Sequence, residues 1–377
     1  MSNSSNSLFD RALHYLEELV AMPSPSGDEA NVSRYLATVL EGFGLSTELQ
    51  PVGPRYNVIS RTPATQETAA LLLTGHTDTI PVMTGWRTDP FRATSEGERI
   101  YGLGAADQKG GIAAQLAALE ALRAEGRLEQ ANVLVAFTPD EEALSDGMLA
   151  FLAGKPRARL VLLSEPHFHP ATIGWPGKAL VKATVHGKAA HGGRPSQGVN
   201  AIEQAAHFLS ALSAAAVPEH PNLGAHPFVS LSIKGGYERY SLTVPDRCTV
   251  VISKQLVPGE TKDTVLELVR KATATLTQGH VDFEFDRPYY PPAEQDAGNP
   301  AIQRFAALFR EVTGQPLSLG FGRGVCDGDY LVEAGLTTVS FGPSGGNTHQ
   351  PNEWVSKVEL ATCAEVYLAA LKSWCVI

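Results

Sequence analysis

The segment that follows the apolar run 69–73 carries two side chains suited to metal chemistry. It reads TGHTD, so His76 and Asp78 stand two positions apart just beyond an expected buried strand. An imidazole that binds a metal through one ring nitrogen usually donates its other N–H to an acceptor, often a carboxylate. The string therefore predicts a metal ligand and its orienting partner, with a solvated loop as the alternative.

Four further segments place acidic or imidazole groups after expected strands or in a glycine-rich loop. They are Asp107 within YGLGAADQKGG, the carboxylates Asp140, Glu141 and Glu142 within FTPDEE, Glu165 within LLSEP, and His349 within GGNTHQP. Taken singly, each has an ordinary interpretation, such as a helix cap for Asp107 or an exposed loop for His349. Their joint occurrence favours a single site.

The geometry of an α/β sheet explains how groups so far apart in the sequence can meet. Ligands of open α/β sheets bind beyond the carboxyl ends of the strands. Two histidines and three carboxylates suit a dinuclear zinc site, in which a bridging carboxylate holds the ions about 3.5–4 Å apart. One carboxylate then remains as a general base. Because adjacent carboxylates repel one another, we expect a positive group beside the triplet 140–142.

Two kinds of element order divide the chain. Outside the middle third, helices alternate with short apolar strands, which predicts an α/β domain with a mostly parallel central sheet and helices on both faces. The expected helices lie within 8–43, broken by a turn at 23–27, and at 110–127; the expected strands lie at 57–60, 70–74, 132–138, 159–164 and 337–342.

The middle third has the order β-α-β-β-α-β, which is that of a ferredoxin-like α+β sandwich. Its expected elements are strand 178–186, helix 199–214, strands 228–234 and 247–256, helix 262–276 and strand 279–285. We interpret residues 178–287 as a dimerisation or lid domain inserted into a catalytic zinc-binding domain of residues 1–177 and 288–377. The proline-rich segment 287–292 is expected to be the return linker.

Composition narrows the class of protein. A chain of 377 residues is long enough for two domains, and a net charge of −10 argues against nucleic acid or an anionic membrane as partner. No apolar run reaches the roughly 20 residues of a membrane helix, and residues 1–7 do not read as a signal peptide. The four cysteines are scattered, which predicts reduced thiols and a cytoplasmic location.

At these residues the chain closely resembles the dinuclear-zinc amidohydrolases and metallopeptidases that include glutamate carboxypeptidase, acetylornithine deacetylase, succinyl-diaminopimelate desuccinylase and aminoacylase. The resemblance spans nearly the whole chain, and the motifs occur in the family's order. They are GHTDTIPV, WRTDPF, YGLGAADQKGG, TPDEE, SEP, GKAAHGG, VPGE and NTHQPNE.

The resemblance assigns a ligand to each metal. It implies that His76 and Glu165 bind one zinc ion, that Glu142 and His349 bind the other, and that Asp107 bridges both. It therefore implies two Zn²⁺ per subunit, which Co²⁺ or Mn²⁺ can replace.

The resemblance also implies roles for three groups that bind no metal. Asp78 would orient His76, Glu141 would be the general base, and the peptide bond from Asp107 to Gln108 would be cis. His191, in the inserted domain, would reach the active site of the neighbouring subunit of a homodimer and stabilise the oxyanion of the substrate. From its local sequence alone, His191 reads as an exposed loop residue.

These roles imply hydrolysis of an amide bond. Two zinc ions depress the pKa of a bridging water towards neutrality. Glu141 would take the water proton and deliver it to the leaving amine, while the metals and His191 would stabilise the tetrahedral intermediate. The substrate would be a small N-acyl amino acid or a short peptide.

The chain departs from the family where many relatives hold the substrate carboxylate. Many relatives have asparagine and arginine where this chain has Leu242 and Gln255, and the desuccinylases often have arginine where it has Asp329. Neither Leu242 nor Gln255 can form arginine's bidentate contact with a carboxylate. The replacement candidates are Arg239, Lys254 and Arg323, although each also reads as an ordinary surface or packing residue.

Three functions therefore compete. The first is an N-acyl amino acid deacylase or carboxypeptidase, and the second is a dipeptidase or aminopeptidase of the same fold. The third is a non-catalytic binding relative, which the presence of every ligand and of the base disfavours.

Overall fold

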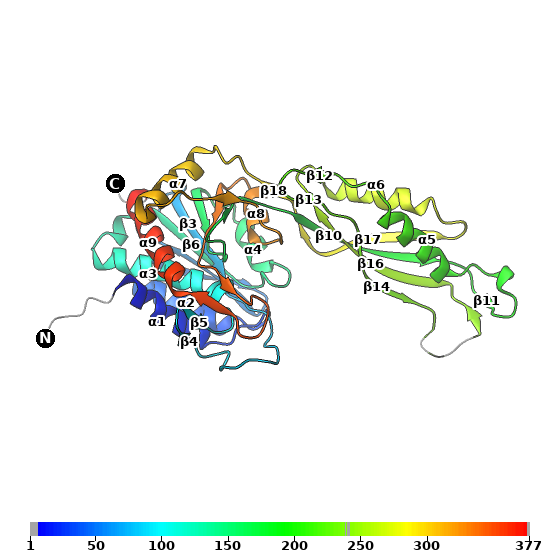
Figure 1. The fold of residues 1–377 in the computed structure, drawn as a ribbon, viewed down its shortest axis with the longest axis horizontal. Coiled ribbons are helices and arrows are strands. Elements are labelled where there is room, and N and C mark those ends of the chain that lie inside the picture. The colour runs from blue at the N-terminus through cyan, green and yellow to red at the C-terminus, as the bar shows by residue number, and fades with distance from the viewer. Residues whose placement is uncertain (1–6, 238, 240–241, 375–377) are drawn as a thin grey trace. The chain divides into compact units, whose positions relative to one another are not determined.

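The computed structural model describes residues 7–237, 239 and 242–374. The chain divides into two compact units (Figure 1). The first is made of Met1–Gly174, Gln295–Gly322 and Tyr330–Ile377, and the second of Trp175–Glu294 and Arg323–Asp329.

The first unit, over its described residues, is built on an eight-stranded sheet. The strand order is β1-β2-β6-β3-β7-β20-β8-β19. The central strands β6, β3, β7 and β20 are parallel, whereas β1 and β2 pair antiparallel at one edge, so the sheet is mixed and mostly parallel, as predicted. The strands are β1 (Ser46–Val52), β2 (Arg55–Arg61), β3 (Ala69–His76), β6 (Val133–Thr138), β7 (Ala158–Leu163), β8 (Ala171–Thr172), β19 (Leu319–Gly320) and β20 (Thr338–Ser340).

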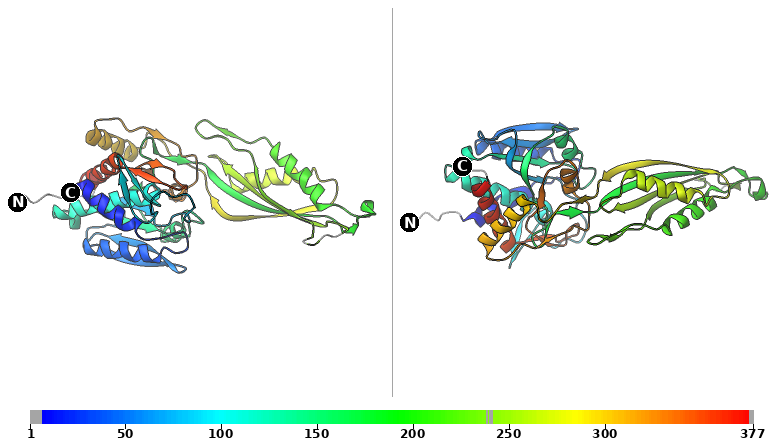
Figure 2. Two further views of the ribbon diagram at one scale, coloured as in Figure 1. Left: turned by 60° about the horizontal axis from the view of Figure 1, so that its bottom comes forward. Right: turned by 90° about the horizontal axis from the view of Figure 1, so that it is seen from above.

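Both faces of this sheet are covered. All residues of β3 are buried, and alternate side chains of a strand point to opposite faces. Leu71 and Leu73 belong to the main core, to which the helices at 8–20 and 357–374 contribute, and these two, blue and red, lie side by side in Figure 2. The helices of the unit are α1 (Leu8–Val20), α2 (Ala30–Gly42), α3 (Gly110–Ala124), α4 (Asp146–Ala153), α7 (Pro300–Thr313) and α9 (Lys357–Trp374). On β2, Val58 joins that core while its neighbour Asn57 donates a hydrogen bond to the Gly147 carbonyl in α4, so α4 covers the other face.

A small second sheet in the first unit carries the loop around His349. It has the order β21-β22-β5-β4. Its strands are β4 (Thr94–Glu96), β5 (Arg99–Tyr101), β21 (Gly345–Gly346) and β22 (Trp354–Ser356). Because Trp354 pairs with Tyr101, the loop between β21 and β22 lies next to the glycine-rich segment that contains Asp107.

The second unit contains an antiparallel sheet of order β14-β16-β10-β17 with two helices on one face. Its elements are β10 (Gly177–His186), α5 (Ala201–Ser213), β14 (Val229–Gly235), β16 (Arg247–Leu256), α6 (Lys262–Thr273) and β17 (His280–Tyr290). Their sequence order is the β-α-β-β-α-β order predicted for this part of the chain.

The expected linker at 287–292 is wrong for its first four residues, because β17 continues to Tyr290 and pairs there with Lys178. The reason is the position of β17 at the edge of the sheet. An edge strand has one row of backbone groups without a ladder partner, so it tolerates Pro288, which has no N–H to donate. A β-bulge between Lys178 and Leu180 takes up the irregularity.

The sequence predicts no membrane-spanning helix. Across the described ranges, none of the helices combines the length and the apolar character that a bilayer span requires.

Phe341 anchors an aromatic cluster between the sheet and its helices, and its truncation should destabilise the first unit. The ring is fully buried, with centroids 5.4 Å from Phe305 and 5.9 Å from Tyr367. Phe341→Ala should cost about 3–5 kcal/mol of unfolding free energy, since it removes the transfer free energy of the ring and leaves a cavity. Urea unfolding followed by tryptophan fluorescence measures the loss. Val358→Ala, at a position that is 60% exposed, is the control and should change stability by less than about 0.5 kcal/mol.

Candidate metal centre

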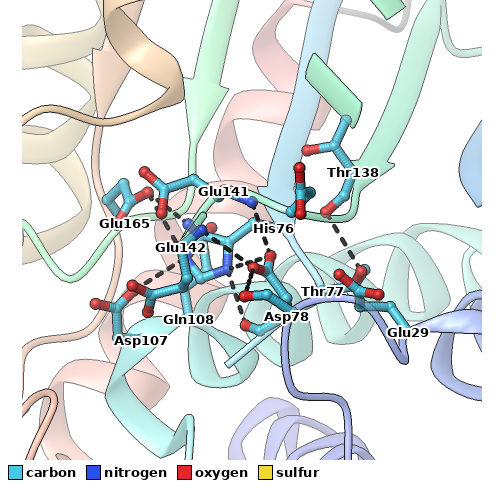
Figure 3. A network of polar contacts seen from close by, with 12 residues as sticks. Glu29, His76, Thr77, Asp78, Asp107, Gln108, Thr138, Glu141, Glu142 and Glu165 are labelled. Atoms are coloured by element: carbon cyan, nitrogen blue, oxygen red, sulfur yellow. Dashed lines mark hydrogen bonds and ion pairs between the residues drawn. The ribbon is translucent and has the colours of Figure 1, made fainter. Parts of the chain in front are cut away.

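The predicted ligands come from loops at one edge of the central sheet. His76 is the last residue of β3, the acidic triplet follows β6, and Glu165 lies two residues beyond β7. These three strands are parallel neighbours, so their carboxyl ends meet at the same edge. Figure 3 shows His76 amid Asp107, Glu142 and Glu165.

The ligand atoms form two groups that share Asp107. In the first, His76 Nε2 lies 3.0 Å from Asp107 Oδ1 and 3.9 Å from Glu165 Oε1. In the second, His349 Nε2 lies 3.4 Å from Asp107 Oδ2 and 2.9 Å from Glu142 Oε1. Ligand atoms of a tetrahedral ion with bonds of 2.0–2.1 Å are about 3.3 Å apart, and the four distances from the histidines lie near this value. One ligand atom from each of His76, Asp107 and Glu142 also lies within 4.8 Å of the others, so Glu142 is near both groups. One oxygen of Asp107 faces each group, which is the arrangement of a bridging carboxylate.

The cluster strongly favours positive charge. Hydrogen bonds to Asp107 and Glu142 raise the pKa of His349 to about 10. Burial alone would lower the pKa of His76, but hydrogen bonds to Asp107 and Asp78 raise it well above its usual value. Carboxylates that hold protons on two imidazoles are suited to hold cations in their place, because metal ions and protons compete for the same ring nitrogens.

The segment around Asp107 has an unusual backbone and packs closely against the end of β7. The Asp107–Gln108 peptide bond is cis, as the resemblance implied. The α3 helix begins only at Gly110 and has no side-chain cap, so Asp107 is not the helix cap of the alternative interpretation. A Cβ on Gly111 would overlap the Ser164 carbonyl oxygen, so only glycine lets α3 approach the end of β7 this closely. Glu165 is held in turn by a 2.7 Å hydrogen bond from Gln108 Nε2.

Asp78 fixes both His76 and the acidic triplet. Its carboxylate accepts hydrogen bonds from the backbone N–H groups of Glu141 and Glu142, each at 3.0 Å, and from Ser26 Oγ at 2.7 Å. His76 Nδ1 lies 3.0 Å from the Asp78 carbonyl oxygen and 3.4 Å from its carboxylate. The backbone of Asp78 is therefore the nearer acceptor for His76, and its carboxylate mainly positions the loop of Glu141.

The comparisons with known proteins agree with this geometry. The family model for peptidase family M20/M25/M40 matches residues 72–373. The chain belongs to this family. It is 30% identical over 384 residues to an acetylornithine deacetylase of Myxococcus xanthus, covering 96% of each chain.

Solved structures of the family share the fold. An aminopeptidase from Bacillus cereus matches with a TM-score of 0.80 at 21% identity, covering 97% of this chain and 98% of that one. A Bacillus subtilis protein described as a dinuclear metal binding peptidase matches with a TM-score of 0.71 at 16% identity, covering 97% and 98%. The chain is thus an M20 metallopeptidase or amidohydrolase, and dinuclear metal binding is typical of this family.

Sequence reasoning missed two residues of this M20 site. Arg55, on β2, pairs with Asp140 and lies 3.7 Å from Glu29 and 3.8 Å from Asp146, so it is the positive group expected beside the triplet. Glu353 accepts hydrogen bonds from the backbone N–H groups of Gly104, Ala106 and Asp107. Glu353 stands within the NTHQPNE motif, which could have pointed to it, whereas no motif points to Arg55.

The remaining predicted residues belong to the second unit. His191 is exposed in the short strand β11 (Ala190–His191), and Gly193 N–H donates to its Nδ1. Lys254 is 1% exposed and pairs with Glu260 at 2.9 Å, so it is not free to hold a substrate carboxylate. Arg239 and Arg323 are exposed, and Gln255 bonds to the Arg323 carbonyl oxygen at 3.4 Å.

Glu353→Gln should loosen the Asp107 loop of this M20 member. The carboxylate accepts from Gly104 at 2.9 Å, Ala106 at 2.9 Å and Asp107 at 3.0 Å. An amide would turn its NH₂ group against one of these N–H donors, which should cost about 1–3 kcal/mol of stability and about 10–100-fold in metal affinity. Chelator competition and thermal unfolding measure the two effects. Glu98→Gln, exposed between β4 and β5, is the charge-matched control, and equal behaviour of both variants would contradict the role of Glu353.

Proposed function

We propose that this chain is a dinuclear-zinc amidohydrolase that cleaves the amide bond of an N-acyl amino acid or short peptide. The observation that carries the proposal is the division of donor atoms around Asp107. One of its oxygens lies 3.0 Å from His76, which is 3.9 Å from Glu165, and the other lies 3.4 Å from His349, which is 2.9 Å from Glu142. A single ion would need only one of these groups.

The donor set fits zinc. His76, Glu165 and Asp107 would hold one ion, and His349, Glu142 and Asp107 the other. Imidazole and carboxylate are both zinc ligands, and Co²⁺ or Mn²⁺ accept the same donors. When bound, two such ions supply Lewis acidity, which polarises a substrate carbonyl and makes a nearby water more acidic.

Glu141 would be the general base. The resemblance implies this role for Glu141, and the other two members of the triplet are in contact with other groups, Asp140 with Arg55 and Glu142 with His349. Its backbone N–H is anchored on Asp78, which also contacts His76, so base and ligand share one support. The Glu141 carboxylate would accept the proton of the attacking water and pass it to the leaving amine nitrogen.

Two observations support the proposed substrate class: the similarity to a deacetylase and the residues at the expected carboxylate clamp in the second unit. The acetylornithine deacetylase of Myxococcus xanthus, which covers nearly the whole chain, favours deacylation of an N-acyl amino acid. The usual carboxylate clamp is altered at Leu242 and Gln255, and Lys254 is bound to Glu260. We therefore propose an acyl amino acid outside the strict desuccinylase and glutamate carboxypeptidase classes, with dipeptide hydrolysis as the second candidate.

Glu141→Gln should keep its metal and lose turnover. The amide has the shape of the carboxylate but cannot accept a proton, so the rate should fall about 10²–10⁴-fold. The assay is release of amine from N-acetyl amino acids, N-succinyl amino acids and dipeptides by zinc-reconstituted protein, with metal content measured by elemental analysis. Glu129→Gln, exposed before β6, is the control. An active Glu141→Gln enzyme would remove Glu141 from this role, and fewer than two zinc ions per wild-type chain would reject the dinuclear site.

We also propose that the chain forms a homodimer through the second unit. The strand β14 lies at an edge of its sheet, so one row of its backbone groups has no partner strand in the described chain. Val229, Leu231 and Ile233 on this strand are 53%, 56% and 53% exposed, which is unusual for three large apolar residues on one edge strand. Antiparallel pairing of β14 with its copy would satisfy the backbone and bury these side chains around a two-fold axis.

Leu231→Asp should convert the dimer into a monomer, because a buried unpaired carboxylate opposes the interface. Light scattering after size-exclusion chromatography measures the mass. Val358→Asp, an equally exposed apolar position in the first unit, should leave the dimer intact. The oxyanion role of His191 across the dimer interface can be tested by mixing His191→Ala subunits with Glu141→Gln subunits. In a mixed dimer, one active site would receive both an intact Glu141 and an intact His191, so activity should return. If none returns, His191 does not act across the interface.

A further inference from the structure

We propose that the second unit carries a separate binding site for a divalent transition metal, formed by His186, His280 and Asp282. His186 is the last residue of β10 and His280 the first of β17, and the two are directly paired across the strands. Asp282 lies two residues further along β17, so its side chain points to the same face as that of His280.

This face is the open face of the sheet. Val181, Ala183 and Val185 of β10 belong to the core beneath α5 and α6, and Val281 and Phe283 of β17 pack against that core. The alternating residues, among them the three proposed ligands, therefore point away from the helices. They are 28%, 67% and 73% exposed for His186, His280 and Asp282, so an ion can reach them from solution.

The donor atoms have nearly the spacing of a coordinated ion. Asp282 Oδ2 lies 3.0 Å from His186 Nε2 and 3.9 Å from His280 Nε2. These values lie on either side of the roughly 3.3 Å between ligand atoms of a tetrahedral zinc ion. One ligand atom from each of the three residues lies within 4.8 Å of the others. Rotation of the exposed side chains of His280 and Asp282 would bring all three onto one ion.

One feature distinguishes this cluster from an ordinary surface ion pair. His186 Nε2 is buried and makes no hydrogen bond in the described structure, although Asp282 Oδ2 lies 3.0 Å from it. A buried polar atom without a hydrogen bond is costly, and a bound cation would satisfy it. The two imidazole rings are stacked, with centroids 4.4 Å apart and planes at 7°. Because an imidazole binds an ion in the plane of its ring, the more exposed ring of His280 would turn out of this stack to share an ion with His186.

The chemistry of the donors selects the ion. Two imidazoles and one carboxylate suit Zn²⁺, Ni²⁺, Co²⁺ or Cu²⁺ and not Mg²⁺ or Ca²⁺, which prefer oxygen ligands. With three protein ligands, water would complete the coordination, so the ion should exchange readily. Arg247 is the neighbour of His186 on the other side, in β16, and its charge should weaken binding. The ion would link the neighbouring strands β10 and β17.

The experiment is equilibrium dialysis of the metal-loaded protein against Zn²⁺, with bound zinc counted by elemental analysis. Wild type should bind one more ion per chain than His280→Asn or Asp282→Asn. Glu284→Gln, the next residue on the same face of β17, is the control and should bind as wild type. Arg247→Gln should bind the extra ion more tightly. Since the result is a difference between variants, it does not depend on how many ions the first unit holds.

Thermal unfolding provides a second measurement. His280 is mostly exposed, so His280→Asn should fold with an unchanged melting temperature in chelator. Added Zn²⁺ should then raise the melting temperature of wild type more than that of the variant, because the ion binds the folded state. Equal zinc stoichiometry in wild type and His280→Asn would overturn the proposal. So would an equal loss of zinc in Glu284→Gln, which would mean diffuse binding to the acidic face.

Discussion

The constraint on which the first unit depends is the concentration of negative charge at one edge of its sheet. The carboxylates of Asp78, Asp107, Glu142 and Glu165 lie around one buried imidazole, that of His76. Like charges at such short range raise the free energy of the folded state unless each meets a positive group. The loops around the site supply groups of positive charge or N–H donors to several of these carboxylates.

The carboxylates divide according to what neutralises them. Asp78 and Glu353 accept backbone N–H groups, which fixes the loops that carry the triplet and Asp107. Asp140 is neutralised by Arg55 from the neighbouring strand. Asp107 and Glu142 contact His349, and Glu165 lies 3.9 Å from His76. The charges that orient the loops are thus met by N–H groups and a guanidinium, while those of the predicted ligands converge on two imidazoles.

This division explains which parts of the site could be predicted from sequence. The convergence of His76, Glu142 and Glu165 could be predicted because each follows an apolar strand, and parallel strands bring their carboxyl ends together. Arg55 could not, because it reaches Asp140 only through the antiparallel pairing of β2 with β6, which a strand pattern does not specify. The role of Glu353 likewise depends on a contact between residues more than 240 positions apart. The end of β17 was misplaced because a proline reads as a linker until the strand is known to lie at an edge.

The predicted metal ligands and the predicted substrate-binding positions come from different parts of the chain. The ligands stand in motifs of the first unit, whereas the positions at which the resemblance implies a carboxylate clamp are Leu242 and Gln255 in the second unit. Lys254 is excluded as a substitute because removing it from Glu260 would leave a buried carboxylate uncompensated, which typically costs about 3–5 kcal/mol. Of the three cationic candidates, Arg239 and Arg323 are therefore the ones whose charge is exposed to solvent. A guanidinium can bind a carboxylate in a bidentate manner, so an acidic substrate group held by either would use a position different from that of the usual clamp.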